Sequence, residues 1–134
     1  MLVAELRKLF EDLKKNEQSV LFLSEYDINV QIFIDSGKLL LTTPVYFGSN
    51  YIPGSVRNGI KKTPPFTKDR IMRTSLKVDE KHFRIFLQYL GAVEVFNSEK
   101  FVHLIEDFHY LAEEWRIYLD EHDKNDLVHI RSKK

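Results

Sequence analysis

Apolar residues recur at three- and four-residue spacing near both ends of the chain. Near the N-terminus, polar residues fill the gaps between them, which predicts an amphipathic helix over residues 2–15. Near the C-terminus, one apolar stripe predicts a longer helix from Ser98 to Glu121, with Asn97 as its N-cap. We assign the large side chains of this stripe, Trp115 and Phe108 among them, to the core. The stripe is formed by Phe101, Leu104, Ile105, Phe108, Leu111, Ala112, Trp115 and Leu119.

Between the predicted helices, apolar and polar residues alternate as in strands with one buried face. A tight turn at Ser36-Gly37 joins two of these segments and predicts a hairpin. In the last segment, Gly91 is a candidate bulge or bend. The predicted strands cover residues 20–23, 29–35, 38–45, 71–78 and 82–95.

Prolines and glycines interrupt the middle of the chain, from residue 46 to 69. Pro53 suits the first turn of a short helix that runs through Lys62, and Pro64 would end it. The predicted order of elements is therefore α-βββ-(α)-ββ-α. Strands joined by short turns pair antiparallel, so we expect an α+β fold in which an antiparallel sheet of about five strands is covered by an N-terminal and a long C-terminal helix.

A chain of 134 residues fits one domain. We assign residues 1–125 to a single α+β domain and residues 126–134 to a flexible charged tail. The sequence has no cysteine and no apolar run of the length that a membrane helix requires. We therefore expect a cytoplasmic protein that has no disulfides and does not enter the membrane.

The formal net charge is zero, but the charges are unevenly distributed. Seven basic residues and one acidic residue lie between 51 and 77, whereas nine acidic and three basic residues lie between 97 and 126. Tyr51 and Phe66 lie within the basic segment, and this composition is also found where proteins bind single-stranded nucleic acid. Basic loops are common without such a role, so this reading stays an alternative.

No group of residues has the spacing of a catalytic or metal site. The acids Glu113 and Glu114 are adjacent on a helix and point about 100° apart, so they cannot act as a paired acid and base. We predict a protein that is not an enzyme and that binds no metal or cofactor. The five histidines, none in a zinc-ligand pattern, are His82, His103, His109, His122 and His129.

The last predicted helix contains a Phe, then an Ala followed by Glu-x-Trp-Arg, and then a Leu. These residues are Phe108, Ala112, Glu113, Trp115, Arg116 and Leu119. The motif resembles the closing helix of class I type III secretion chaperones, and the order of elements is similar to theirs. The resemblance implies a homodimer that binds an extended, partly unfolded segment of a secreted effector protein, without ATP or catalysis.

If the resemblance holds, exposed apolar side chains on the first helix and on the outer sheet face would bind the partner. Our candidates are Leu6, Phe10 and Phe33, and Phe33 is the most informative because strand alternation places it on the polar side of its strand. The alternative is that the chain's own loop covers Phe33.

The proline-rich connection over residues 48–65 disfavours a long interface helix, so we expect the dimer contact to come from the last strand segment. Its apolar residues lie on both sides of the strand, and we select Phe83, Phe86 and Tyr89. Two other functions remain open. One is a regulatory protein-interaction domain of the same fold with no secretion role, and the other is nucleic-acid binding by segment 51–77.

Overall fold

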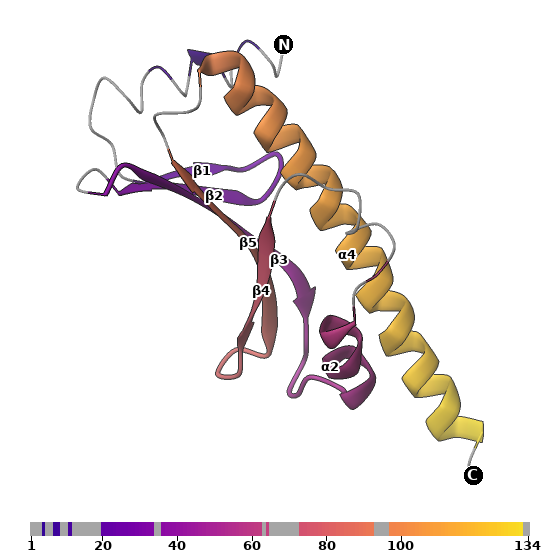
Figure 1. The fold of residues 1–134 in the computed structure, drawn as a ribbon. Coiled ribbons are helices and arrows are strands. Elements are labelled where there is room, and N and C mark those ends of the chain that lie inside the picture. Colours follow the sequence, from indigo (N-terminus) through magenta and orange to yellow (C-terminus); the bar gives the residue numbers. More distant parts are fainter. Residues whose placement is uncertain are drawn as a thin grey trace.

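An antiparallel sheet crossed on one face by a long helix forms the protein (Figure 1). The structure is a computed structural model that describes residues 4, 7, 8, 11, 20–33, 36–62, 64, 73–92 and 97–132. The expected α+β class, the five antiparallel strands and the long C-terminal helix are confirmed. The helix predicted over residues 2–15 lies largely outside the described residues. The elements are β1 (Val20–Leu23), β2 (Ile28–Phe33), β3 (Lys38–Phe47), α2 (Gly54–Lys61), β4 (Thr74–Asp79), β5 (Arg84–Ala92) and α4 (Ser98–Ser132).

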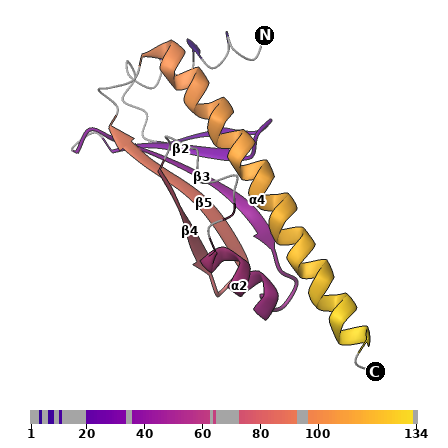
Figure 2. The same cartoon turned by 45° about the vertical axis from the view of Figure 1, so that its right-hand side comes forward.

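The strands follow the order β1-β2-β3-β5-β4, and each pairs antiparallel with its neighbours. The first three form a meander, whose second turn at Ser36-Gly37 is confirmed, with Gly37 at a φ of 66°. The hairpin of β4 and β5 then joins the sheet through β5 and β3. Between the two strand groups, α2 begins after Pro53 and packs against α4 (Figure 2). As expected, this connecting helix is short.

The core lies between α4 and the sheet. Alternate side chains of the central strands, such as Val30, Leu41 and Leu87, point to α4 and are fully buried, because strand pairing aligns them on one face. The predicted apolar stripe of α4 is buried along its whole length. Phe108 is completely inaccessible and Trp115 is 5% exposed, so both belong to the core as predicted.

The sheet has its bulge in β3 and not at Gly91, where the sequence suggested one. The pairing of β3 with β5 shifts between Pro44 and Tyr46, so Val45 and Tyr46 are both buried on the side of α4. At Gly91 the pairing continues without a shift. A Cβ atom at position 91 would lie 2.4 Å from the hydroxyl of Tyr89, so a larger residue would require the tyrosine side chain to move.

Asn97 caps α4 as predicted, since its side-chain oxygen accepts a hydrogen bond of 2.8 Å from the backbone N–H of Lys100. The helix continues to Ser132, well past the predicted end at Glu121. No glycine or proline follows Glu121, so nothing in the sequence interrupts the helical backbone. Residues 126–132 of the predicted flexible tail lie within α4.

We expect Trp115→Ala to lower the free energy of unfolding by about 3–5 kcal/mol, the usual loss when a large aromatic ring is removed from a core. Denaturant titration would measure the change. Ile117→Ala is the matched control, because Ile117 lies on the exposed side of the same helix and its loss should cost less than about 1 kcal/mol. A loss below about 1 kcal/mol for Trp115→Ala would show that the ring is not a core residue.

Candidate protein-binding surface

The face of the sheet opposite α4 carries large apolar side chains among polar ones such as Asn29, Gln31 and Thr42. Both α2 and α4 lie on the other side of the sheet, and no described helix covers this one (Figures 1 and 2). Strand register aligns Val20, Leu40 and Leu90 in one row across the sheet, and Pro44 with Phe86 in another. We call this surface the open sheet face. Its apolar residues are Val20, Phe22, Phe33, Leu40, Pro44, Phe47, Phe86 and Leu90.

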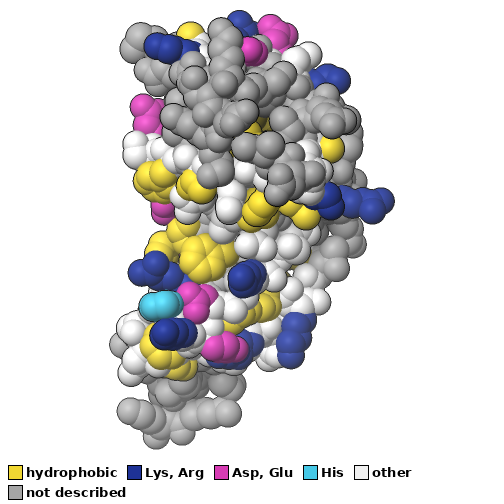
Figure 3. Space-filling view, turned by 90° about the vertical axis from the view of Figure 1, so that its left-hand side faces the viewer, with side chains coloured by type: hydrophobic (Ala, Val, Ile, Leu, Met, Phe, Trp, Pro, Cys, Tyr) yellow, Lys and Arg dark blue, Asp and Glu magenta, His cyan; other side chains and the backbone are white. Residues whose placement is uncertain are grey.

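Several large side chains of the open sheet face are exposed to solvent, whereas Leu40 and Phe86 are half-buried. Phe22 is 51% exposed, Leu90 53% and Phe47 58%. Figure 3 shows hydrophobic side chains gathered across the middle of this side of the molecule, with lysines and arginines beside them. Exposed large apolar side chains gathered on one face among polar ones are typical of a protein-interaction site.

Phe33 belongs to this surface, as strand alternation predicted. It is the last residue of β2, pairs with Lys38 of β3 and is 39% exposed. The backbone carbonyl of Phe33 accepts a hydrogen bond of 2.8 Å from Gly37 N–H, so the following turn closes on its main chain. The other two candidates, Leu6 and Phe10, lie outside the described residues.

The three residues selected for a dimer contact occupy different environments. Phe86 lies on the open sheet face and is half-buried. Tyr89 lies on the face that α4 covers, packs against the core, and burial raises the pKa of its hydroxyl. Phe83 lies in the turn before β5 with a φ of 58° and packs against the core. Of the three selected residues, Phe86 is therefore the one that lies on the open sheet face.

Sequence reasoning missed Phe22, Phe47 and Leu90. For Leu90 a signal was present, because it lies an even number of residues from Phe86 and so shares its side of β5. The strand that contains Phe22 is too short to establish its alternation from sequence. Phe47 could not be placed at all, because the bulge in β3 reverses the alternation just before it.

Arg116 of α4 fixes the helix to the bulge in β3. Its Nε donates to the carbonyl oxygen of Pro44 over 3.0 Å, and its Nη2 donates to Thr43 Oγ1 over 2.8 Å. The Thr43 hydroxyl in turn donates to the carbonyl oxygen of Asp27 over 2.8 Å, and Glu113 pairs with Nη1 of Arg116. One guanidinium thus connects α4 to β3 and, through Thr43, to the turn between β1 and β2.

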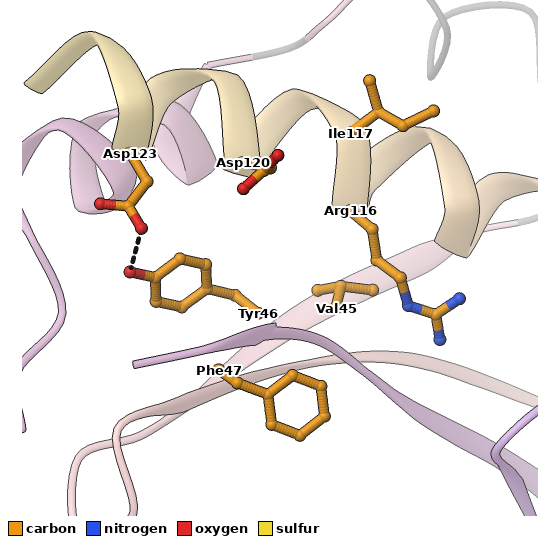
Figure 4. Close-up of a pocket in the computed structure, with 7 residues that line it drawn as sticks. All are labelled: Val45, Tyr46, Phe47, Arg116, Ile117, Asp120 and Asp123. Carbon is orange, nitrogen blue, oxygen red and sulfur yellow. Dashed lines mark hydrogen bonds between the residues drawn. The ribbon is translucent and has the colours of Figure 1, made fainter. Parts of the chain in front are cut away.

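Beside this contact, a groove of about 410 Å³ runs between the end of β3 and α4 (Figure 4). The hydroxyl of Tyr46 donates to Asp123 Oδ2 over 3.1 Å across the groove. Burial raises the pKa of Tyr46 far above its ordinary value, and the bond to Asp123 raises it further, so the hydroxyl stays protonated. The groove is lined by Val45, Tyr46, Phe47, Arg116, Ile117, Asp120 and Asp123.

The basic segment 51–77 lies partly outside the described residues. Within the described part, Arg57 forms a bidentate pair with Glu80, with N–O distances of 2.7 and 2.8 Å. Hydrogen bonding to this guanidinium holds the pKa of Glu80 below its usual value. Arg57 also donates to the carbonyl oxygen of Ile52, whereas Lys61 and Lys62 at the end of α2 are exposed.

Among the described residues, no three histidine, aspartate or glutamate side chains come together as a set that could hold a metal ion. None of the described helices combines the length and the apolar character that a membrane span requires. The sequence matches no protein-family model and no curated protein.

We expect Arg116→Met to lower the free energy of unfolding by about 1–3 kcal/mol, because the partly buried Pro44 carbonyl and Thr43 hydroxyl would lose their donor. Thermal or denaturant unfolding would measure the loss. Arg116→Lys should not restore stability, since one ammonium group cannot reproduce the planar set of donors. As a control, Glu113→Gln removes only the exposed partner and should cost less than about 1 kcal/mol. Equal losses for Arg116→Met and Glu113→Gln would contradict this role.

Proposed function

We propose that this protein binds an extended, partly unfolded segment of a second protein on its open sheet face. In the form that the sequence resemblance suggests, it is a type III secretion chaperone-like protein. It holds a segment of an effector in an export-ready state in the cytoplasm, without ATP or catalysis. The observation that carries the proposal is the group of exposed aromatic and aliphatic side chains on a sheet face that no described helix covers.

Burial of these side chains supplies the driving force. A fully buried leucine or phenylalanine side chain contributes about 1.5–3 kcal/mol relative to an exposed one. Phe22, Phe33 and Leu90 are each exposed by more than a third, so a partner can still gain much of this energy. An extended segment suits the surface because its alternate side chains reach a flat sheet at regular intervals.

The sheet also offers strand edges to a partner backbone. In the described part of the chain, β1 and β4 each pair with a strand on one side only. A partner segment could hydrogen-bond to either edge and place alternate side chains over the open sheet face. Phe22 of β1 lies next to one of these edges, so main-chain pairing and side-chain burial could occur together.

The residues of the chaperone-like motif in α4 have structural roles in this chain. Its apolar members Phe108, Trp115 and Leu119 are in the core, and Arg116 holds α4 on β3. The motif therefore encodes the attachment of a long helix to a sheet. It supports a similar fold, whereas the case for partner binding rests on the open sheet face.

Two alternative functions remain. A regulatory domain without a secretion role would bind a different protein on the open sheet face. Nucleic-acid binding would use the basic segment 51–77, of which Lys77 lies on this face with Lys38 and Arg84. Against it, the guanidinium of Arg84 lies over the Phe47 ring, 5.3 Å from its centroid, and so occupies a face on which a base would stack.

We expect Phe33→Glu to weaken partner binding at least about tenfold, because a charge would replace apolar surface at the contact. A photo-crosslinking residue at position 22 would first capture the partner in the native host, and proteolysis would define the bound segment. Calorimetry with this segment would then measure affinity for the wild type and Phe33→Glu. Tyr110→Glu is the control, because Tyr110 is an exposed aromatic residue of α4, away from the open sheet face.

Equal affinity of wild type and Phe33→Glu for the segment would contradict the proposed surface. Binding of oligonucleotides that falls steeply between about 50 and 200 mM salt would instead favour nucleic acid. A partner that binds only in its folded state would favour the regulatory domain over the chaperone-like function.

We also propose a homodimer in which Phe86 contributes to the contact. Light scattering should show a dimer at tens of micromolar, and Phe86→Glu should dissociate it, since an unpaired buried carboxylate costs several kcal/mol. Phe33→Glu, on the same sheet face, should leave the dimer intact. A strict monomer at this concentration would remove the dimer from the proposal.

A further inference from the structure

A hollow lies on each side of the edge strand β4. On the side of the sheet that α2 and α4 cover, the hollow has a volume of about 360 Å³, and Ile60, Leu76 and Trp115 form its apolar wall. On the open sheet face, the hollow has a volume of about 410 Å³ and is lined by Lys77 and Phe86 among others. In the described part of the chain, β4 pairs with β5 on one side only. The side chains of a further strand beside β4 would therefore alternate between the two hollows.

Both hollows carry lysines. Lys61 and Lys62 line the hollow on the covered side, and Lys77 lines the hollow on the open sheet face. None of the three forms an ion pair with another described residue. Positive charge therefore flanks the free edge of β4 on both faces of the sheet.

The carboxylates beside Lys77 are already bound within the turn and to α2. Asp79 Oδ2 lies 2.9 Å from His82 Nδ1, and Asp79 Oδ1 accepts a hydrogen bond of 3.1 Å from the backbone N–H of Lys81. Glu80 is held by Arg57 in the bidentate pair. An acidic ligand would complement the charge that remains at this edge.

The other edge of the sheet lacks this charge. β1 consists of four apolar residues, Val20–Leu23. An acidic segment gains no electrostatic attraction from the side chains of such a strand, whereas Lys77 of β4 supplies it directly. Charge complementarity thus distinguishes the two edges.

We propose that the extended partner segment adds to β4 as a further strand in which apolar and acidic residues alternate. In strand addition, main-chain hydrogen bonds supply affinity, and pockets for alternate side chains supply specificity. The apolar side chains fill the hollow beside Leu76 and Trp115 on the covered side. The acidic side chains lie on the open sheet face and reach Lys77.

This inference rests on the proposed function and specifies the edge at which the partner pairs and the charge of its sequence. A nucleic acid is the other common polyanion, but it has no regular series of N–H and C=O groups for the edge of β4 to pair with. A free strand edge between two hollows therefore favours a peptide.

The probe is a short fluorescent peptide in which valine and glutamate alternate, and binding is followed by anisotropy. We expect Lys62→Gln/Lys77→Gln to bind it about tenfold more weakly. Both lysines are exposed, so the variant should stay folded, and circular dichroism would check this. Glutamine in place of the peptide's glutamates should weaken binding to the wild type and have little further effect on the variant. Trp115, the one tryptophan of the chain, lines the covered hollow, so its emission should change when the peptide binds.

N-methylated peptides test the strand pairing itself. An edge strand bonds to the main-chain groups of every second residue of its partner, because the residues between them face away. Methylation of the valine amides and methylation of the glutamate amides should therefore differ, with one peptide losing binding and the other keeping most of it. Equal loss in both peptides would overturn strand addition at β4.

The matched control is Lys100→Gln/Lys124→Gln, which removes the same charge from exposed positions of α4 outside both hollows. Equal weakening by both double variants would reduce the effect to general attraction and would overturn the site. Oligonucleotide binding that is tighter than peptide binding and is lost in Lys62→Gln/Lys77→Gln would overturn it in favour of nucleic acid.

The captured partner segment separates this inference from the proposed function. If Phe33→Glu weakens its binding while Lys62→Gln/Lys77→Gln changes neither the segment nor the peptide, the edge assignment fails and the proposed function stands. If the lysine variant weakens its binding and Phe33→Glu does not, the edge assignment stands and the contact with the open sheet face at Phe33 fails.

Discussion

Phe101, Phe108 and Leu119 are fully buried where α4 lies along the sheet, and they extend over five turns of that helix. This single packed layer accounts for most of the core, because α2 is short and rests against α4. Any sheet has two faces, and in the described structure the chain supplies helices for one. Burial on that face thus determines which side chains are left outside on the other.

The outer face is unusual in what it retains. Antiparallel sheets with one solvated face commonly carry polar residues there, and here Phe22, Phe33, Phe86 and Leu90 stand on that face among polar residues such as Gln31 and Gln88. These four side chains point away from the core between α4 and the sheet. The proposed partner would give them the burial that this core does not.

Sequence reasoning recovered the elements that repeat a simple period. The stripe of α4, the Asn97 cap and the alternation around Phe33 are local patterns, and each follows from one helix or strand alone. It failed where the outcome depends on contacts between elements. The bulge after Pro44 could be predicted only by someone who knew that β3 pairs with β5. It also depends on Arg116 of α4, which donates a hydrogen bond to the Pro44 carbonyl oxygen.

The groove could not be predicted for the same reason. Asp120 and Asp123 look like ordinary solvated acids in the sequence, and Phe47 looks like a strand residue of unknown orientation. Val45 and Tyr46 lie beside these acids because the bulge places both under α4, whereas Phe47 turns to the opposite side at the edge of the sheet.

Arg116 fixes the geometry at the end of β3. It binds the carbonyl of Pro44, the residue at which the register shifts, and so it holds the end of β3 beside α4. The same shift turns Phe47 away from α4 and onto the open sheet face, where the guanidinium of Arg84 lies over its ring. A contact on the covered side of the sheet therefore determines which aromatic ring the opposite side presents.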